Sequence, residues 1–187
     1  MKRIGNLYAT MCDIETIKRA INNAAKGKRS RPYIAKVLRN IDYYAAELKE
    51  KLETHTVELS PNNYEEIYDS SCMKTRKITI PRYYPDQVIH WLVITAIQPV
   101  LERGMYRYCC GSVPRRGGID AKAYVETAIQ DSKMRYVAKL DVSKFFNSVK
   151  PDILLAMLRR KIKDEDMLEL IAKILKNGGD ELPIGYY

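Results

Sequence analysis

One aspartate and two aromatic residues stand close together in the stretch YVAKLDVSKFFNSV, residues 136–149. Asp141 follows an apolar-rich run, and Phe145 and Phe146 lie within five residues of it. A carboxylate at the end of a buried strand is costly to desolvate, so it normally has a cation or a metal ion beside it. Mg²⁺ in particular is held by a few carboxylates together with substrate phosphates. The pattern therefore predicts a strand over residues 136–141 that presents a metal-binding carboxylate.

Asp141 by itself supplies only part of such a site. A Mg²⁺ site takes more than one carboxylate, so further ligands must come from other segments. An alternative for an isolated aspartate is a capping role, because Asp141 stands just before Ser143 and Lys144. The choice between the two depends on the longer pattern around Asp141.

The elements that position these residues are predicted to be mainly helical. Apolar residues recur at three- and four-residue steps, and proline or aspartate stands at several of the expected helix starts. The helices are expected at Asp13–Ala25, at Pro32–Leu52, from Asp86 with a kink or a new segment at Pro99, at Asp120–Asp131, from Pro151, and from Asp164 to Gly178.

Two further strands are predicted between the helices, at Tyr64–Cys72 and Arg76–Pro81. Isoleucine alternates with Lys77 and Thr79 in the second strand, which predicts a dry face and a wet face, with these two polar residues in solvent. Helices, a hairpin, more helices, the strand at 136–141 and final helices follow one another along the chain. This order indicates an α+β fold.

Composition favours a polyanionic partner. The 187 residues include 32 Lys and Arg against 23 Asp and Glu, which gives a formal charge of +9. Nucleic acid is the commonest partner of such an excess. Met1-Lys2-Arg3 is followed by polar residues, and no apolar run approaches ~18 residues, so we expect neither a signal peptide nor a membrane span. A cytoplasmic protein is therefore expected.

Two groups of basic residues are candidates for contacts with nucleic acid. One is a compact cluster beside Tyr33, and the other lies in a loop between helices. Their members are Lys26, Lys28, Arg29 and Arg31 in the first group and Arg115 and Arg116 in the second. An exposed loop between helices that carries only solvated charges is the alternative for the first group.

Several segments resemble the reverse transcriptase family, and they occur in that family's order. Leu140–Val149 is similar to the first catalytic motif. Thr75–Pro81 resembles the first fingers motif, Gly111–Gly118 the second, and Leu182–Gly185 the start of the fourth catalytic motif. The resemblance covers about residues 64–187.

The resemblance implies roles for the residues around Asp141. Asp141 would bind both catalytic Mg²⁺ ions, and the backbone carbonyl of Val142 would bind one of them. Phe146 would be the steric gate that disfavours a ribose 2′-hydroxyl, although a core phenylalanine is the alternative. Phe145 is expected to fill that core role.

Residues of the hairpin and of the last motif would contact the incoming nucleotide. Arg76 would reach the triphosphate, since a guanidinium fits phosphate in a bidentate manner. Lys74 is a second candidate, and either residue could instead be a solvated hairpin charge. Ile184 occupies the position where many members carry a glutamine that touches the nucleotide or the template. An isoleucine at this position resembles the reverse transcriptases of diversity-generating retroelements.

The implied fold is the fingers and part of the palm of a right-hand polymerase. An N-terminal helical segment would cover residues 1–60, the fingers 61–134 and a partial palm 135–187. The family's paired aspartates have no counterpart, because no Asp-Asp pair occurs in the sequence. We therefore expect an N-terminal piece of a bacterial or phage-type enzyme, related to those of diversity-generating retroelements, group II introns or retrons, and inactive alone.

The partners implied are an RNA template, a DNA primer and deoxynucleoside triphosphates, with Mg²⁺ as the cofactor. Two other functions stay open. The chain could be a non-catalytic RNA-binding or scaffold module that keeps the polymerase shape. It could also belong to an abortive-infection-type polymerase that extends without a template.

Overall fold

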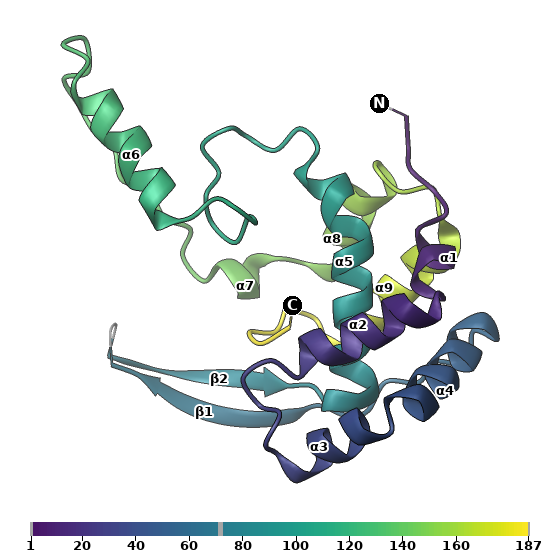
Figure 1. Cartoon of the computed structure of the whole chain (residues 1–187). Helices are drawn as coiled ribbons and strands as arrows, with labels where there is room; N and C mark the ends of the chain where they lie inside the picture. Colours follow the sequence, from purple (N-terminus) through teal and green to yellow (C-terminus); the bar gives the residue numbers. More distant parts are fainter. Residues whose placement is uncertain (1, 71–72, 187) are drawn as a thin grey trace. The chain divides into compact units, whose positions relative to one another are not determined.

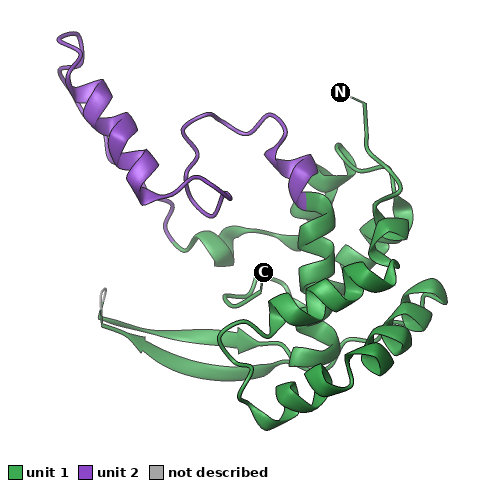
Figure 2. Cartoon of the chain, in the orientation of Figure 1, with its two compact units in different colours: residues 1–97, 144–187 green, residues 98–143 purple. Residues whose placement is uncertain are grey.

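The computed structural model describes residues 2–70 and 73–186 of the 187. These residues form helices and one antiparallel hairpin, which confirms the α+β class. The chain divides into two compact units, one made of residues 1–97 with 144–187 and the other of residues 98–143 (Figure 2). None of the helices in the described residues is long and apolar enough to cross a membrane.

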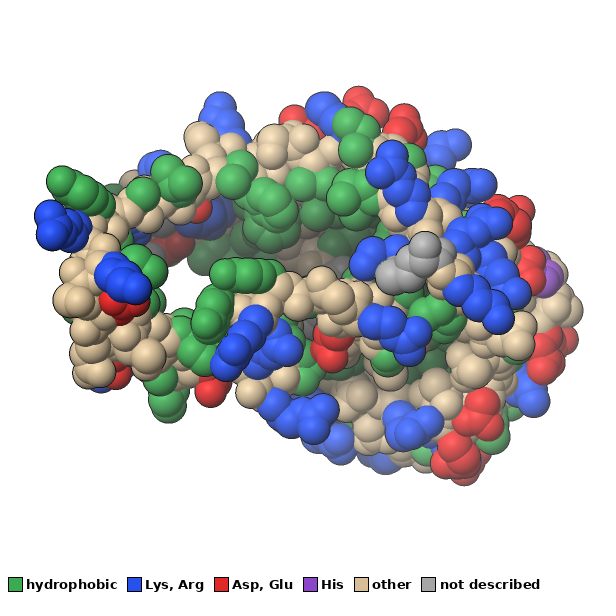
Figure 3. All heavy atoms as spheres, turned by 90° about the horizontal axis from the view of Figure 1, so that it is seen from above, with side chains coloured by type: hydrophobic (Ala, Val, Ile, Leu, Met, Phe, Trp, Pro, Cys, Tyr) green, Lys and Arg blue, Asp and Glu red, His purple; other side chains and the backbone are tan. Residues whose placement is uncertain are grey.

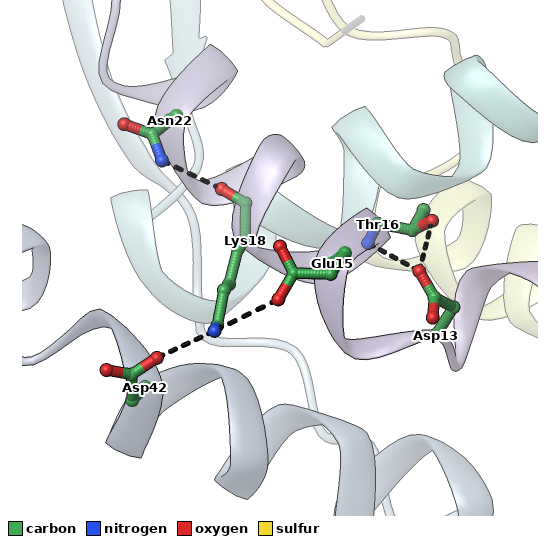
Figure 4. Close-up of polar contacts among 6 residues, drawn as sticks. All are labelled: Asp13, Glu15, Thr16, Lys18, Asn22 and Asp42. Carbon is green, nitrogen blue, oxygen red and sulfur yellow. Dashed lines mark hydrogen bonds and ion pairs between the residues drawn. The ribbon is translucent and has the colours of Figure 1, made fainter.

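Four helices open the first unit: α1 (Leu7–Met11), α2 (Ile14–Ala24), α3 (Pro32–Arg39) and α4 (Ile41–Glu53) (Figure 1). Helix α2 begins where predicted, because the carboxylate of Asp13 accepts a hydrogen bond from the backbone N–H of Thr16. Helix α2 packs against α4. Figure 4 shows the polar link between them, in which Lys18 lies 3.1 Å from Glu15 and 2.7 Å from Asp42.

The single helix predicted over Pro32–Leu52 is wrong, because the chain breaks at Asn40 into α3 and α4. Asn40 has φ −116° and ψ 37°, outside the helical region. Its side-chain amide donates to the carbonyl of Lys36, and its backbone N–H donates to Val37. Asparagine offers the backbone such local alternatives, and apolar periodicity does not register them.

The hairpin consists of β1 (Asn63–Asp69) and β2 (Lys74–Ile80), paired in antiparallel register with Asn63 opposite Ile80 and Asp69 opposite Lys74. The predicted hairpin is therefore confirmed, except that Cys72 lies outside the described residues. The wet-and-dry alternation is wrong at the base of β2. Thr79 is buried, whereas Ile78 and Ile80 are only half-buried.

The first unit continues with η1 (Tyr83–Gln87), α5 (Val88–Glu102), α7 (Phe145–Ser148), α8 (Pro151–Arg159) and α9 (Glu165–Gly178), although the last residues of α5 belong to the second unit. Helix α5 runs through Pro99. Asp164 caps α9 as predicted, and Gly179 follows its end. Fully buried side chains from several helices form the core, among them Ile17, Ile21, Leu48, Leu52, Ile89, Leu92, Met167 and Leu168.

The second unit contains α6 (Gly118–Ile129) and the segment 135–142, which we call the Asp141 segment. The strand predicted there is wrong. Among the described residues, no strand pairs with the Asp141 segment, and an unpaired stretch leaves its backbone groups to water. Apolar residues alone do not make a strand without a partner.

The two units do not coincide with the three segments 1–60, 61–134 and 135–187. That division follows the motifs and describes expected function. It stays a prediction.

Candidate functional site

Asp141 and Val142 are exposed to solvent. The apolar residues before them are exposed as well, with Tyr136, Val137 and Leu140 at 94%, 88% and 90%. No hydrogen bond or ion pair within residues 2–70 and 73–186 involves the Asp141 carboxylate. The expected burial of this segment is therefore wrong, whereas the role of Asp141 as a metal ligand stays a prediction. Its carboxylate is instead an open oxygen donor.

Phe145 and Phe146 lie on the short helix α7, which follows Lys144 at φ 50°. Phe145 is 53% exposed and Phe146 40%, and their rings meet edge to face with centroids 5.7 Å apart. The core role predicted for Phe145 is wrong, because its ring contacts Phe146 at the surface. Part of the Phe146 ring is accessible to solvent, and its predicted role as a steric gate stays a prediction.

Arg76 projects from the middle of β2. Its Nε lies 3.0 Å from Oδ2 of Asp69, and the side chains of Arg76 and Asp69 are 45% and 29% exposed. The register places Arg76 opposite Ile67, so the ion pair runs diagonally across the hairpin. An ion pair this exposed contributes only about 0–1 kcal/mol, so an anion of higher charge can displace Asp69 at small cost.

Lys74 and Lys77 lie on the same strand and are exposed. Lys74 is opposite Asp69 in the register, at the distal end of the hairpin. Lys77 faces the other side, where its Nζ lies 4.2 Å from the centroid of the Tyr64 ring. Side chains alternate between faces, so Lys74 and Arg76 share one face and Lys77 has the other.

Ile184 and Gly185 dock on the free edge of β2. The backbone N–H of Thr79 donates to the carbonyl of Ile184 at 2.8 Å. Gly185 has φ +112°, and a Cβ there would overlap the carbonyl oxygen of Thr79. Thr79 is buried where the chain covers it, which explains why the predicted alternation fails. Only glycine allows this close approach.

Polar side chains fasten the same region, which we call the hairpin foot and define as Ser60, Asn62, Thr79, Asn177, Gly185 and Tyr186. The side-chain amide of Asn62 donates to the carbonyl of Asn177 at 2.8 Å and to the hydroxyl of Tyr186 at 2.7 Å. Asn177 in turn donates to the carbonyl of Ser60 at 3.2 Å. Three distant stretches of sequence are thereby tied together.

Two buried titratable groups border the hairpin foot. Asp86 accepts a hydrogen bond from the backbone N–H of Ser60 at 3.1 Å, and burial raises the pKa of its carboxyl. His90 lies against the Tyr186 ring with centroids 4.7 Å apart, and burial lowers its pKa to about 4. Both groups therefore favour their neutral forms.

Arg115 and Arg116 differ in their contacts within the second unit. The guanidinium of Arg116 donates to the carbonyls of Tyr106 and Arg107, both at 3.4 Å, so it helps to shape the loop that carries it. Arg115 has φ +62° and is exposed. Of the two, Arg115 has the side chain available for a phosphate.

The residues 26–31, which we call the basic loop, connect α2 to α3. Lys26, Arg29 and Arg31 are exposed, whereas Lys28 is partly buried. The ammonium group of Lys28 donates to the Gln87 side chain, and burial lowers the pKa of Lys28. The basic loop is therefore anchored through Lys28 and through Arg29, whose guanidinium donates to the Asn22 side chain at 3.1 Å, while Lys26 and Arg31 face water.

The described residues supply only part of a donor set for a divalent cation. No group of three His, Cys, Asp or Glu side chains within residues 2–70 and 73–186 is arranged to hold a metal ion. The Asp141 carboxylate and the Val142 carbonyl are oxygen donors of the type that Mg²⁺ prefers. They fit Mg²⁺ in kind, and further ligands would have to come from substrate, water or other carboxylates.

The structure brings together only some of the predicted residues. Arg76 lies on the hairpin and Ile184 lies against the edge of β2, because the Ile184 carbonyl is bonded to Thr79 and Arg76 is three residues along that strand, or about 10 Å. Asp141, Arg115 and Arg116 belong to the second unit. Sequence reasoning missed Asn62 and Tyr186, because hydrogen bonds between distant segments leave no local pattern. Gly185, next to Ile184, is the one residue in this region whose type could have indicated a close backbone contact.

No protein-family model matches the chain. A stretch of 108 residues is 27% identical to the protein YkfC of Escherichia coli strain K12, and it covers 56% of this chain and 28% of YkfC. The chain therefore spans less than a third of the length of that relative.

Proposed function

We propose that the chain forms the fingers and the first part of the palm of an RNA-directed DNA polymerase. The observation that carries the proposal is the occurrence of four reverse-transcriptase-like segments in the family's order, from Thr75 to Gly185. The exposed Asp141 carboxylate and the docking of Ile184 on the strand that carries Arg76 support it.

The hairpin would bind the incoming nucleotide. Arg76 would exchange its exposed contact with Asp69 for the triphosphate, which offers more negative charge and bidentate geometry. Ile184, held by Thr79, would contribute an apolar contact beside it. Lys74 on the same face would add charge without fixing the orientation.

Asp141 and Val142 would supply oxygen ligands to Mg²⁺, with water, substrate phosphates and carboxylates outside this chain completing the set. Bound Mg²⁺ would neutralise the charge that develops on the transferred phosphoryl group. The exposed Phe146 ring would exclude nucleotides that carry a 2′-hydroxyl. The exposure of the Asp141 carboxylate and the partial exposure of the Phe146 ring support these roles.

The test is template-directed primer extension by the complete reading frame that contains these residues. We expect a DNA product complementary to the RNA template, formed only with deoxynucleotides and Mg²⁺. The isolated chain of 187 residues should give no product. Extension by the isolated chain, or a product unrelated to the template, would contradict the proposal; the second result would indicate an untemplated polymerase.

A second candidate is a non-catalytic RNA-binding module with a polymerase-like shape. The irregular conformation of the Asp141 segment favours it, because a catalytic carboxylate normally sits on a rigid element. RNA binding without any extension, unchanged by Asp141→Asn, would favour this module over the polymerase.

A further inference from the structure

The positive charge of the chain is concentrated in one stretch. Residues 16–41 contain eight of the 32 Lys and Arg residues and none of the 23 Asp and Glu residues. The rest of the chain therefore carries 24 basic against 23 acidic residues, which is almost neutral. Figure 3 shows Lys and Arg side chains together with Asp and Glu side chains over one face of the molecule. A segregated charge produces a local field that a mixed surface does not.

Four of these eight cations donate to other side chains, among them Lys28 to Gln87 and Arg29 to Asn22 at 3.1 Å. Lys18 pairs with Asp42 and Glu15, and Arg19 donates to the hydroxyl of Thr16 (Figure 4 shows Lys18). The others lie in the basic loop and on α3. Lys26, Arg29, Arg31, Lys36 and Arg39 are exposed. No ion pair among the described residues involves these five side chains.

Aromatic rings join the basic loop to the residues after β2. The guanidinium of Arg82 lies 5.6 Å from the centroid of the Tyr33 ring, and the ammonium of Lys28 lies 5.9 Å from that of Tyr83. The Tyr33 ring meets the Tyr83 ring edge to face at 6.4 Å. Tyr33 is 38% exposed and Arg82 is also exposed, so a cation and an aromatic ring stand together in solvent.

We propose that the basic loop, Tyr33 and Arg82 form a binding surface for single-stranded nucleic acid. The exposed cations would contact successive phosphates, and the Tyr33 ring would stack on a base. Surfaces that bind single strands combine these two features, a cationic track and an accessible aromatic ring. The charge and exposure of the basic loop, Tyr33 and Arg82 support this surface independently of the polymerase proposal.

An anionic membrane is the competing partner for such a charge, and the apolar residues argue against it. Helices that lie in a membrane interface expose an apolar face. The apolar residues of α2 and α3 point into the core instead: Ile17 and Val37 are 0% exposed, and Ile34 is 3% exposed. The basic loop itself reads KGKRSR and contains no apolar side chain.

The test compares two triple variants of the full chain that remove the same charge. The first is Lys26→Gln with Arg29→Gln and Arg31→Gln. The control is Lys122→Gln with Lys133→Gln and Arg160→Gln, at exposed sites elsewhere. Binding of a fluorescein-labelled single-stranded RNA of 20 nucleotides is followed by anisotropy at several salt concentrations. Circular dichroism checks that each variant is folded.

We expect the first triple to weaken binding at least tenfold at low salt. It should also reduce the slope of log Kd against log salt by about 2, since each lost phosphate contact on a single strand removes about 0.7. The control should change the slope by less than about 0.5. Equal effects of the two triples would overturn the proposal, because net charge would then suffice.

A second pair of variants tests the stacking contact without changing charge. Tyr33→Phe keeps the ring and should bind RNA as the unchanged chain does. Tyr33→Leu removes the ring and should weaken binding about tenfold, with the salt slope unchanged. Equal affinity of the two variants would contradict a stacking role. Chain that floats with phosphatidylserine vesicles and does not bind RNA would also overturn the proposal. Failure of primer extension would leave it intact.

Discussion

The hairpin foot and the Asp141 segment are opposite in how they are held. At the foot, Thr79, Asn62 and Asn177 exchange hydrogen bonds with residues more than a hundred positions away in the sequence. In the Asp141 segment, Leu140 and Tyr136 are almost fully exposed, and no strand among the described residues pairs with it. The two regions resemble motifs of the same family. Only one of them is fixed by contacts within this chain.

This difference separates the parts of the proposed site. Arg76 and Ile184, which are proposed to bind the nucleotide, are positioned by the fold of this chain. The Asp141 carboxylate, which is proposed to bind a metal ion, lies on a segment that no strand among the described residues pairs with. Four changes test this contrast, and their expected effects decrease in the order given.

Gly185→Ala should have the largest effect on stability. A Cβ at Gly185 would overlap the carbonyl oxygen of Thr79, and φ is +112°. We expect a loss of about 3 kcal/mol or more in the free energy of unfolding, measured with urea. Gly27→Ala is the matched control, because φ there is +74° and nothing lies within 4 Å of the added carbon. It should cost about 1 kcal/mol. Equal costs would show that the foot is not closely packed.

His90→Gln should change how stability depends on pH. Burial lowers the pKa of His90 from 6.5 to about 4, so the unfolded chain binds a proton that the folded chain does not. The contribution of His90 to the free energy of unfolding is therefore lost as pH falls below 6.5. The expected loss is about 2 kcal/mol between pH 7 and pH 5.

The raised pKa of Asp86 acts with the opposite sign, because the folded chain keeps a proton that the unfolded chain releases. The difference between the unchanged chain and His90→Gln therefore isolates the histidine. Urea unfolding at pH 7 and pH 5 measures it. An identical pH dependence in both proteins would mean that the imidazole is not buried.

Tyr186→Phe should have a moderate effect. Its hydroxyl accepts hydrogen bonds from Asn62 at 2.7 Å and from Asn177 at 3.4 Å, but both amides keep a second acceptor. We expect a loss of about 1 kcal/mol in the free energy of unfolding. Tyr136→Phe, at a ring that is 94% exposed, should change stability by less than about 0.3 kcal/mol. The reverse ranking would contradict the contrast between the two regions.

Leu140→Ala should have the smallest effect, because Leu140 is 90% exposed. The expected loss is below about 0.5 kcal/mol. Leu168→Ala, the same substitution at a fully buried position, should cost about 2–5 kcal/mol. Denaturant unfolding compares the two. A cost above 2 kcal/mol at Leu140 would indicate that the Asp141 segment is a buried strand after all.

The sequence predicted those features that depend on neighbouring residues. Asp13 and Asp164 cap their helices because their side chains reach backbone groups three residues ahead. The hairpin was predicted with its exposed Arg76. Periodicity missed the break at Asn40, since apolar spacing continues across it while the backbone does not.

Features that depend on distant segments were not predictable. Thr79 is buried because Ile184 docks on it, and the sequence of β2 contains no pattern that predicts this docking. The contact between Arg82 and Tyr33 joins the end of the hairpin to α3 across about fifty residues of sequence. The strand predicted at 136–141 is wrong for a related reason. Its apolar residues fit the pattern of a buried strand, but a strand also needs a neighbouring strand to pair with.

The most direct test of the central claim is the effect of Asp141→Asn on RNA-templated DNA synthesis by the complete reading frame. Asparagine keeps the shape and removes the charge that would hold Mg²⁺. Asp131→Asn is the matched control, at an exposed aspartate of the same unit. We predict that Asp141→Asn slows extension about a thousandfold or more, about 4 kcal/mol in the barrier, and leaves RNA binding intact. Equal synthesis by the two variants would contradict the account.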